Sequence, residues 1–161
     1  MMQIEAGIIT VSDRAARGHY EDLGGPAVRR AAEARGWKVL AETLAPDEKR
    51  DIQRAIRQQI NKGCHVILTT GGTGVGPRDV TPEAVREIAV RELPGFGEVM
   101  RSESMKITPN AILSRNLAVV VDKTLVICLP GNPGGAVECL GFVAAAVQHC
   151  VEVLREIPTH C

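Results

Sequence analysis

A glycine-rich stretch carries the clearest chemical signal of this sequence. The apolar run Val66–Leu68 predicts a buried strand, and four glycines follow it within residues 71–76. Glycines allow positive φ angles and a close approach of the backbone to a ligand. Thr81 is expected to cap the next helix, with Pro82 at its first position. A strand, a glycine loop and a helix N-terminus together present N–H groups that bind anions such as phosphate.

The common phosphate-binding motifs do not fit this loop. Gly71 and Gly76 have P-loop spacing, but Pro77-Arg78 stands where Lys-Ser or Lys-Thr would follow, and no GxGxxG is present. An ordinary strand-to-helix turn therefore remains an alternative. Asp79 favours a ligand site, because the expected cap at Thr81 leaves Asp79 without an obvious structural role. Carboxylates beside substrate phosphates are typical ligands of Mg²⁺.

Length and composition indicate a single soluble globular domain. The 161 residues are enough for one domain with its own core, and 45% of them are hydrophobic. Lys plus Arg and Asp plus Glu each number 19, so the net charge is 0. This balance argues against a general nucleic-acid or anionic-membrane surface. With 2% aromatic residues, stacking platforms for single-stranded nucleic acid are not expected.

The five cysteines and the N-terminus point to a reducing compartment. The cysteines are far apart and form no CxxC, which predicts neither a disulfide framework nor a zinc site. Cys64 and Cys128 are expected in the core. No basic-then-apolar signal is visible at the N-terminus, and no apolar run approaches transmembrane length. We expect a cytoplasmic protein with no membrane partner.

Apolar runs and helical patterns alternate along the chain. Strands are expected at residues 4–11, 37–44, 64–70, 117–121 and 124–129. Helices are expected at residues 26–35, from a turn at 45–48 to Gly63, at 81–92, at 98–107 and at 134–154, with a break at 93–97. The predicted fold class is α/β: a three-layer sandwich with a mostly parallel sheet, helices on both faces and one antiparallel hairpin.

Polar residues follow several predicted strands. Ligands bind beyond the carboxyl ends of parallel strands, so Ser12-Asp13, Asp47, the 71–79 loop and Pro130–Asn132 should converge on one edge. Alternatives remain for three of these features. Asp47 could cap a helix, Ser12-Asp13 could cap the first loop, and Asn132 could serve both as a cap and as a pocket wall.

Two charged side chains and the last helix also leave alternatives. Arg78 could neutralise phosphate or pair with a carboxylate, and Glu138 could be exposed at an edge or paired. The helix at 134–154 is unusually apolar, which predicts cover by the sheet and raises the option of another subunit.

Six segments, in one order, span almost the whole chain: Val11–Asp13, Pro46–Glu48, Thr70–Gly74 with Pro77–Ala84, Pro94–Glu98, Ala111–Arg115 and Leu129–Pro133. Together they resemble the molybdopterin adenylyltransferase family of molybdenum-cofactor biosynthesis, and the related domain of gephyrin. The resemblance implies a single molybdopterin-binding domain over residues 1–161. Its activity would join ATP to molybdopterin with Mg²⁺, giving adenylyl-molybdopterin and pyrophosphate.

The resemblance also implies roles for individual residues and partners. Asp47 and Asp79 would be catalytic and hold or orient Mg²⁺. The nucleotide phosphates would lie on Gly71, Gly72, Thr73, Gly74, Pro130, Gly131 and Asn132. The pterin and nucleotide pockets would include Ser12, Asp22, Ser104, Ser114 and Arg115. A homo-oligomer, most simply a trimer, is implied, as is a separate molybdate-insertion protein.

Two other functions use the same features. One is a pterin-binding or scaffolding module without turnover, and the other is a nucleotide pyrophosphatase with the same phosphate loop. A pure binder does not need both Asp47 and Asp79 beside the loop, so their presence favours catalysis.

Overall fold

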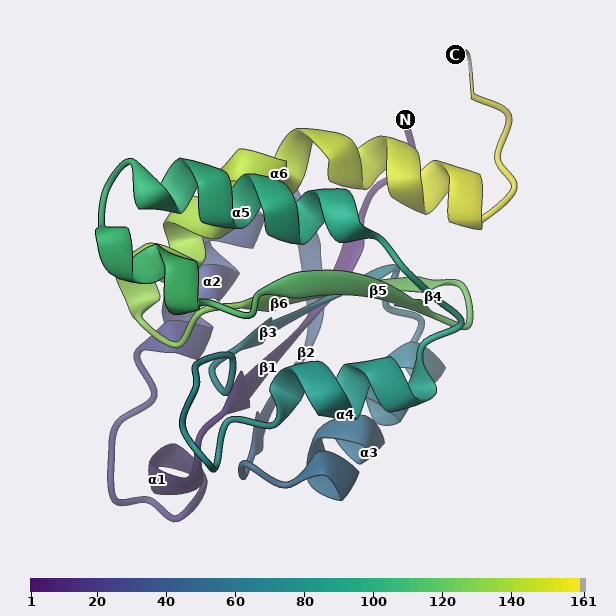
Figure 1. Ribbon diagram of the computed structural model, residues 1–161. Helices are drawn as coiled ribbons and strands as arrows, with labels where there is room; N and C mark the ends of the chain where they lie inside the picture. Colours follow the sequence, from purple (N-terminus) through teal and green to yellow (C-terminus); the bar gives the residue numbers. More distant parts are fainter. Residues whose placement is uncertain (160–161) are drawn as a thin grey trace.

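The computed structural model, which describes residues 1–159, is built on a six-stranded mixed sheet (Figure 1). The strands, in chain order, are β1 (Glu5–Val11), β2 (Lys38–Ala45), β3 (Val66–Thr70), β4 (Arg91–Glu92), β5 (Leu117–Val121) and β6 (Thr124–Leu129). Their spatial order is β2-β1-β3-β6-β5-β4. The β2-β1-β3-β6 part is parallel, and β5 is antiparallel to both β6 and β4. The predicted hairpin of the last two long strands is confirmed.

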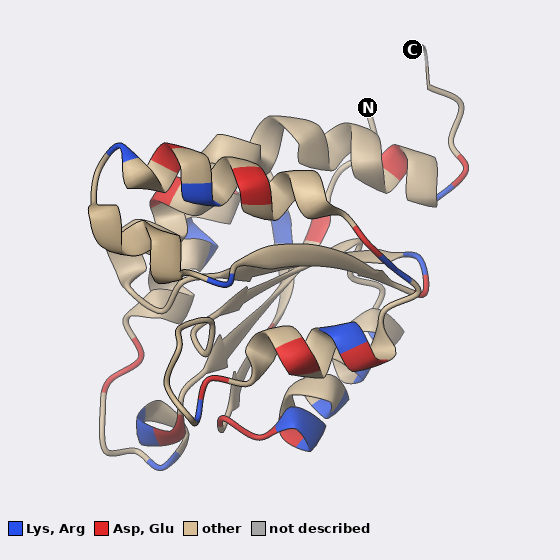
Figure 2. Cartoon of the chain, in the orientation of Figure 1, with Lys and Arg blue, Asp and Glu red and all other residues tan. Residues whose placement is uncertain are grey.

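Helices cover both faces of the sheet. One face carries α2 (Gly24–Glu33), α5 (Pro94–Met105) and α6 (Pro133–Leu154), and the other carries α3 (Lys49–Asn61) and α4 (Thr81–Ile88) (Figure 1). Two apolar clusters fill the spaces between the sheet and these helices. Figure 2 shows charged residues on the helices and connections, whereas the central strands carry almost none. The predicted three-layer α/β sandwich is therefore confirmed.

A short edge strand, β4, lies inside the stretch predicted as a helix over residues 81–92. α4 ends at Ile88, and Ala89 adopts an extended conformation. Val90 and Leu93 then donate backbone hydrogen bonds to the carbonyls of Val120 and Ala118. The edge of β5 has unpaired backbone groups, and residues 90–93 pair with them as a strand. The local helical pattern of this segment contains no information about that distant edge.

The predicted break at residues 93–97 is wrong, because α5 begins at Pro94. Proline suits the first turn of a helix, where its missing N–H would be unpaired in any case. Gly97 serves packing: a Cβ there would lie 2.6 Å from the carbonyl oxygen of Asn116. Gly97 therefore allows α5 to pack closely against the segment before β5.

Thr81 does not cap α4 with its side chain, contrary to the sequence-based prediction. It is the first residue of the helix, and the cap position belongs to Val80. The buried Thr81 hydroxyl donates to the Gly71 carbonyl at 3.0 Å, and the Thr81 N–H donates to the Gly72 carbonyl at 3.1 Å. Thr81 thus ties the glycine loop to α4, because the loop folds back over the helix start.

The helix α6 is long and apolar enough to span a membrane by length and composition, which the sequence-based expectation overlooked. Core helices of soluble proteins pass the same test. One side of α6 packs against α2, α5 and the sheet. Within the single chain, however, only 28% of its most apolar window is buried. Other α6 residues, among them Phe142 and Leu154, are only partly buried against the core, so part of the helix surface remains accessible.

The cysteines expected in the core lie there. Cys64 and Cys128 are fully buried, and burial raises the thiol pKa of Cys64 to about 11 and that of Cys128 to about 12. Cys161, another of the five, lies outside the described residues.

Candidate functional site

The glycine loop follows β3 at the carboxyl edge of the parallel strands. Gly71 and Gly72 have φ angles of +105° and +70°, which side chains rarely adopt. A Cβ on Gly71 would lie only 2.2 Å from the backbone oxygen of Val11. The Gly71 N–H donates to the Leu129 carbonyl at 3.2 Å, which joins the loop to the end of β6. These contacts place the loop between the ends of β1 and β6.

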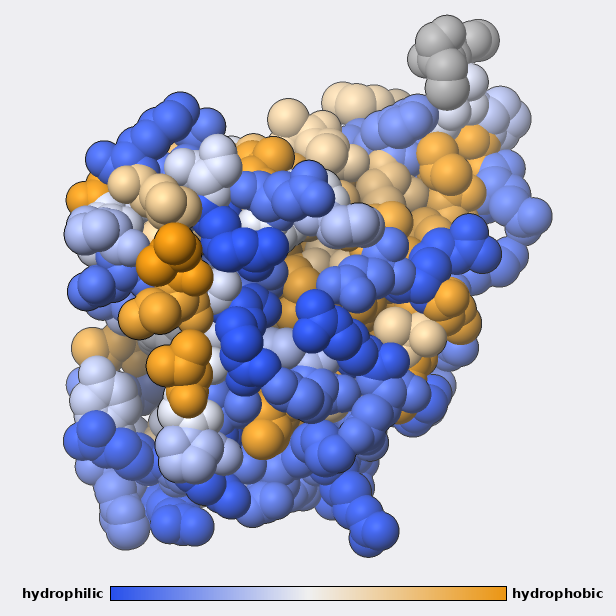
Figure 3. All heavy atoms as spheres, in the orientation of Figure 1, coloured by the Kyte–Doolittle hydropathy of each residue, from blue (hydrophilic) through white to orange (hydrophobic). Residues whose placement is uncertain are grey.

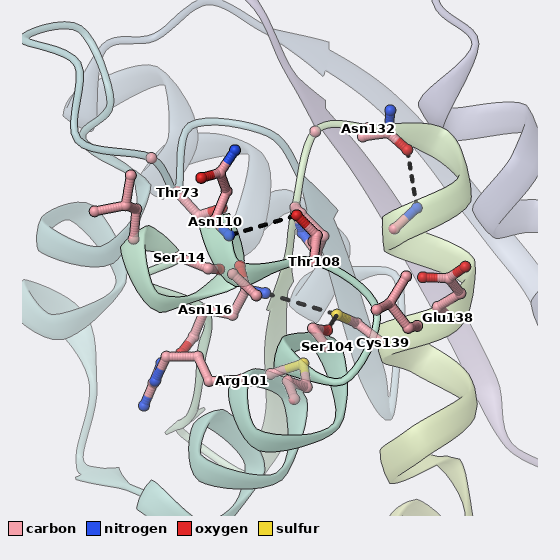
Figure 4. Close-up of a pocket in the computed structure, with 18 of the residues that line it drawn as sticks. Thr73, Arg101, Ser104, Thr108, Asn110, Ser114, Asn116, Asn132, Glu138 and Cys139 are labelled. Atoms are coloured by element: carbon pink, nitrogen blue, oxygen red, sulfur yellow. Dashed lines mark hydrogen bonds between the residues drawn. The ribbon is translucent and has the colours of Figure 1, made fainter.

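Two cavities lie on either side of this loop. The larger, of about 680 Å³, is bordered by the loop, α5, the 3₁₀ helix η1 (Pro109–Leu113) and the start of α6 (Figure 4). The smaller, of about 240 Å³, lies beside the ends of β1 and β3 and the short helix α1 (Asp13–Ala16). Gly131 lines both cavities. The expected convergence of strand ends therefore produces two adjoining cavities, which share a wall.

The predicted site residues divide between the two cavities. The larger one is lined by Thr73, Gly74, Ser104, Ser114, Pro130, Gly131 and Asn132. The smaller one is lined by Ser12, Asp22, Asp47, Gly71, Gly72, Asp79 and Gly131. Both predicted carboxylates thus lie on one side of the loop. Within the described part of the chain, Glu138 is the only acidic side chain at the larger cavity. It is exposed at the edge of the cavity, which was one of the two alternatives for it.

Asp47 is held by a reciprocal pair of hydrogen bonds with Asp13. The Asp13 N–H donates to Asp47 Oδ2 at 2.9 Å, and the Asp47 N–H donates to Asp13 Oδ1 at 2.9 Å. The helix α3 begins at Lys49 with Glu48 at its cap position, so the alternative that Asp47 caps it is wrong. Burial raises the pKa of Asp47, and the nearby carboxylates of Asp13 and Asp79 contribute in the same direction.

Asp79 has a structural contact that the sequence did not reveal. Its Oδ2 accepts a hydrogen bond from the Gly76 N–H at 2.9 Å, which closes a tight turn within the loop. The expectation that Asp79 lacks a structural role is therefore wrong. Among residues 1–159, no other hydrogen bond reaches the Asp79 carboxylate, which leaves Oδ1 without a partner there.

Arg78 pairs with carboxylates, which was one of its two alternatives. Its Nε lies 3.0 Å from Asp13 Oδ2, and its Nη2 lies 2.7 Å from Glu48 Oε1. The hydrogen bond from Arg78 is the main reason why the pKa of Asp13 is lowered. Asp13 therefore stays ionised while it positions Asp47.

Arg115 supports the glycine loop from outside both cavities. Its backbone N–H donates to the Thr73 carbonyl, and its guanidinium donates to the carbonyls of Gly74 at 2.8 Å and Asp79 at 2.7 Å. It also pairs with Glu83. Burial would raise the pKa of Glu83, but the hydrogen bond that Glu83 accepts from Arg115 and the nearby positive charges lower it. Sequence reasoning assigned Arg115 to the substrate pocket, but the structure places it as a brace of the loop.

Ser12 and Asp22 lie at the smaller cavity and already have structural partners. Ser12 Oγ caps α1 by accepting from the Ala15 N–H at 3.2 Å, which was one of its alternatives. The Asp22 oxygens accept from Thr10 Oγ1 and from the Gly25 N–H, each at 2.9 Å. Asp22 therefore organises the start of α2 as well as bordering the cavity.

Asn132 is both a helix cap and a cavity wall, as the sequence suggested. Its Oδ1 accepts from the Gly135 N–H at 3.0 Å, with Pro133 at the first position of α6. In the larger cavity, Ser104 Oγ lies 3.4 Å from Cys139 Sγ, whereas Ser114 Oγ has no hydrogen-bond partner among the described residues. Figure 4 shows these side chains around one cavity, on α5, on α6 and at the adjoining ends of η1 and α6.

Several polar residues of the larger cavity were missed by sequence reasoning. They are Arg101, Thr108, Asn110, Asn116 and Cys139. Asn116 directly follows Arg115, a predicted site residue, and only this adjacency in the sequence could have indicated that Asn116 lines the cavity. The packing of α5 and η1 against α6 brings the others together, and no local pattern encodes that packing.

The carboxylates fit a cation that is shared with a ligand. The described residues contain no group of three or more His, Cys, Asp or Glu side chains that could hold a metal alone. Mg²⁺, however, commonly binds one or two carboxylates, waters and substrate phosphates. Asp47 and Asp79 line the same small cavity beside the glycine loop. This donor set therefore suits Mg²⁺ bound together with phosphates.

The fold and the site define an α/β protein with two cavities on either side of a glycine loop. Residues 7–149 match the family model described as "Probable molybdopterin binding domain". The molybdopterin adenylyltransferase of Haemophilus influenzae is 42% identical over 94% of this chain and 85% of its own length. That of Helicobacter pylori strain J99 is 39% identical over 96% and 89%, respectively. The chain therefore belongs to the molybdopterin adenylyltransferase family.

Solved structures agree with this assignment. The molybdopterin biosynthesis enzyme MoaB from Thermus thermophilus superimposes with a TM-score of 0.90 at 41% identity, covering 97% of this chain and 99% of that one. A more distant protein, CinA from Thermoplasma acidophilum, has a TM-score of 0.70 at 17% identity and shares the fold alone.

Proposed function

We propose that this protein transfers the adenylyl group of Mg·ATP to molybdopterin, giving adenylyl-molybdopterin and pyrophosphate. The observation that supports this most strongly is the pair of cavities that meet at the glycine loop and Gly131. A reaction that joins two phosphate-bearing substrates needs both of them held with their phosphates at one place. Curated relatives with this activity cover nearly the whole chain.

The two cavities suit different substrates. The larger one has the volume of a typical small-molecule site and offers mainly hydroxyl, amide and apolar groups, which fit a pterin ring. The smaller one contains Asp47 and Asp79, which fit the Mg²⁺-bound phosphates of ATP. Loop residues Gly71–Gly74 would then lie under the reacting phosphates of both substrates.

The proposed step is an in-line displacement at phosphorus. An oxygen of the terminal phosphate of molybdopterin forms a bond to the α-phosphorus of ATP, the bond from that phosphorus to the bridging oxygen breaks, and pyrophosphate leaves. Such transfer depends on positioning and charge neutralisation more than on a protein nucleophile. The loop N–H groups would orient the phosphates, and Asp47 and Asp79 would hold Mg²⁺, which supplies charge neutralisation when bound.

Pyrophosphate release tests this function and separates it from the two alternatives. The protein is mixed with Mg·ATP in the presence and absence of molybdopterin, and pyrophosphate is measured. Release that requires both substrates supports adenylyl transfer. Release without molybdopterin would identify a nucleotide pyrophosphatase, and molybdopterin binding without any release would identify a non-catalytic binding or scaffold module.

The cellular setting is part of the same proposal. The family match supports one molybdopterin-binding domain over residues 1–161. A cytoplasmic location fits a biosynthetic enzyme of this kind. Molybdate insertion would then fall to a separate protein that accepts adenylyl-molybdopterin as its substrate.

We expect a homo-oligomer, and we propose a trimer on the basis of the family resemblance. Only 28% of the most apolar window of helix α6 is fully buried within one chain. Figure 3 shows further apolar side chains exposed near η1, where Ile112 and Leu113 are 66% and 53% exposed. Sedimentation velocity or light scattering at micromolar concentration measures the mass directly, and a monomer alone would contradict this expectation.

A further inference from the structure

The innermost part of the larger cavity holds an amide whose oxygen has no partner. Asn116 is only 3% exposed, and no hydrogen bond from residues 1–159 reaches its Oδ1. Its Nδ2 lies 3.8 Å from Cys139 Sγ, which is a weak contact (Figure 4). The neighbouring Ser114 Oγ is also buried without a partner in the described part of the chain. Two polar groups of one cavity wall therefore remain unsatisfied in the free protein.

The backbone of Asn116 is held firmly in place. Arg101 Nη1 donates to the Asn116 carbonyl at 2.7 Å, and the absence of a Cβ on Gly97 lets α5 approach the same oxygen. The side chain therefore projects from a fixed point.

Burying an acceptor without a donor destabilises a protein, and such groups in native structures call for a specific explanation. A leucine has nearly the same shape as asparagine and would avoid this cost. A ligand N–H that reaches the amide oxygen would remove the cost only in the bound state. Such an arrangement favours ligands that carry a donor at this position and rejects those that lack one.

We propose that Asn116 determines substrate specificity by accepting a hydrogen bond from a ring N–H or amino group of the nitrogen heterocycle in the larger cavity. This inference rests on the proposed function, in which that heterocycle is the pterin of molybdopterin. Asn116 lies away from the carboxylates of the smaller cavity. It therefore recognises the ring and takes no part in the chemistry at phosphorus.

The substitution Asn116→Leu tests this assignment, because it removes the amide while keeping the volume. Molybdopterin is titrated anaerobically into wild type and variant, and binding is followed by pterin fluorescence. We expect affinity to fall by about ten-fold or more, as is typical where a buried hydrogen-bonding group of a site is lost. The melting temperature should stay the same or rise, since the unpaired acceptor is gone. Affinity for Mg·ATP, measured on the same variant, serves as the control and should not change.

The outcomes separate this inference from the proposed function. Equal molybdopterin affinity of wild type and Asn116→Leu, with wild-type binding intact, would overturn the role of Asn116 alone. No binding of molybdopterin by the wild type would contradict the proposed function as well. A lower melting temperature with unchanged affinity would identify Asn116 as a structural residue only. If the leucine variant does not fold, Asn116→Ala carries the same expectation for affinity.

Discussion

Replacing Asp79 with asparagine is expected to lower the turnover of adenylyl transfer by about a hundred- to a thousand-fold, as the loss of a positioned electrostatic group typically does. Asparagine keeps the shape of the side chain, and its Oδ1 can still accept the hydrogen bond from the Gly76 N–H. The change therefore removes the charge that would hold Mg²⁺ while the turn of the loop remains. The melting temperature and the affinity for molybdopterin should change little.

Steady-state turnover over a range of Mg²⁺ concentrations, beside the melting temperature, measures this effect. Asp47→Asn provides a matched comparison, because an amide oxygen can still accept from the Asp13 N–H. If Asp47 shares the cation, Asp47→Asn should lose activity in the same way. The variant should not be less stable for reasons of burial, because burying a neutral amide costs less free energy than burying a carboxylate. A folded Asp79→Asn protein with near-normal turnover would remove the catalytic assignment of Asp79.

Substituting alanine for Gly71 is expected to destabilise the fold by on the order of 3 kcal/mol, since backbone strain and a steric clash combine there. The φ angle of Gly71 is +105°, and a Cβ would lie 2.2 Å from the Val11 oxygen. That oxygen belongs to the end of β1, which cannot move aside without disturbing the sheet. Denaturant unfolding measures the loss, and nucleotide binding should weaken as the loop is displaced.

Gly36→Ala is the matched control. Gly36 has a φ of +80°, but a Cβ there would meet no atom within 4 Å. Its substitution should cost only the strain of a positive φ, about 1 kcal/mol. The difference between the two variants isolates the contact with Val11. Equal losses at both positions would show that the loop yields easily and that the tight packing of Gly71 is unimportant.

Local patterns along the chain determined the layout of this protein. Alternating apolar runs and helical periodicity specified the α/β sandwich and the β5–β6 hairpin, because each pattern reflects the faces that one element buries. The convergence of Asp47, the 71–79 loop and Asn132 followed from a general property of parallel strands, whose carboxyl ends share one edge. Asn132 and Pro133 likewise encode the start of α6 through adjacent residues alone.

Contacts between distant segments were decided only by the tertiary structure. The Thr81 hydroxyl donates to the Gly71 carbonyl, and the Asp47 carboxylate accepts from the Asp13 N–H. In both cases the backbone group belongs to another segment that only the folded chain places nearby. The strand β4 depended on an edge left open by β5. The division of the site into two cavities arose from packing α5 and η1 against α6, as did the burial of Asn116 Oδ1 without a partner among the described residues. A sequence pattern records which face of an element is buried, whereas the partner that buries it is chosen in three dimensions.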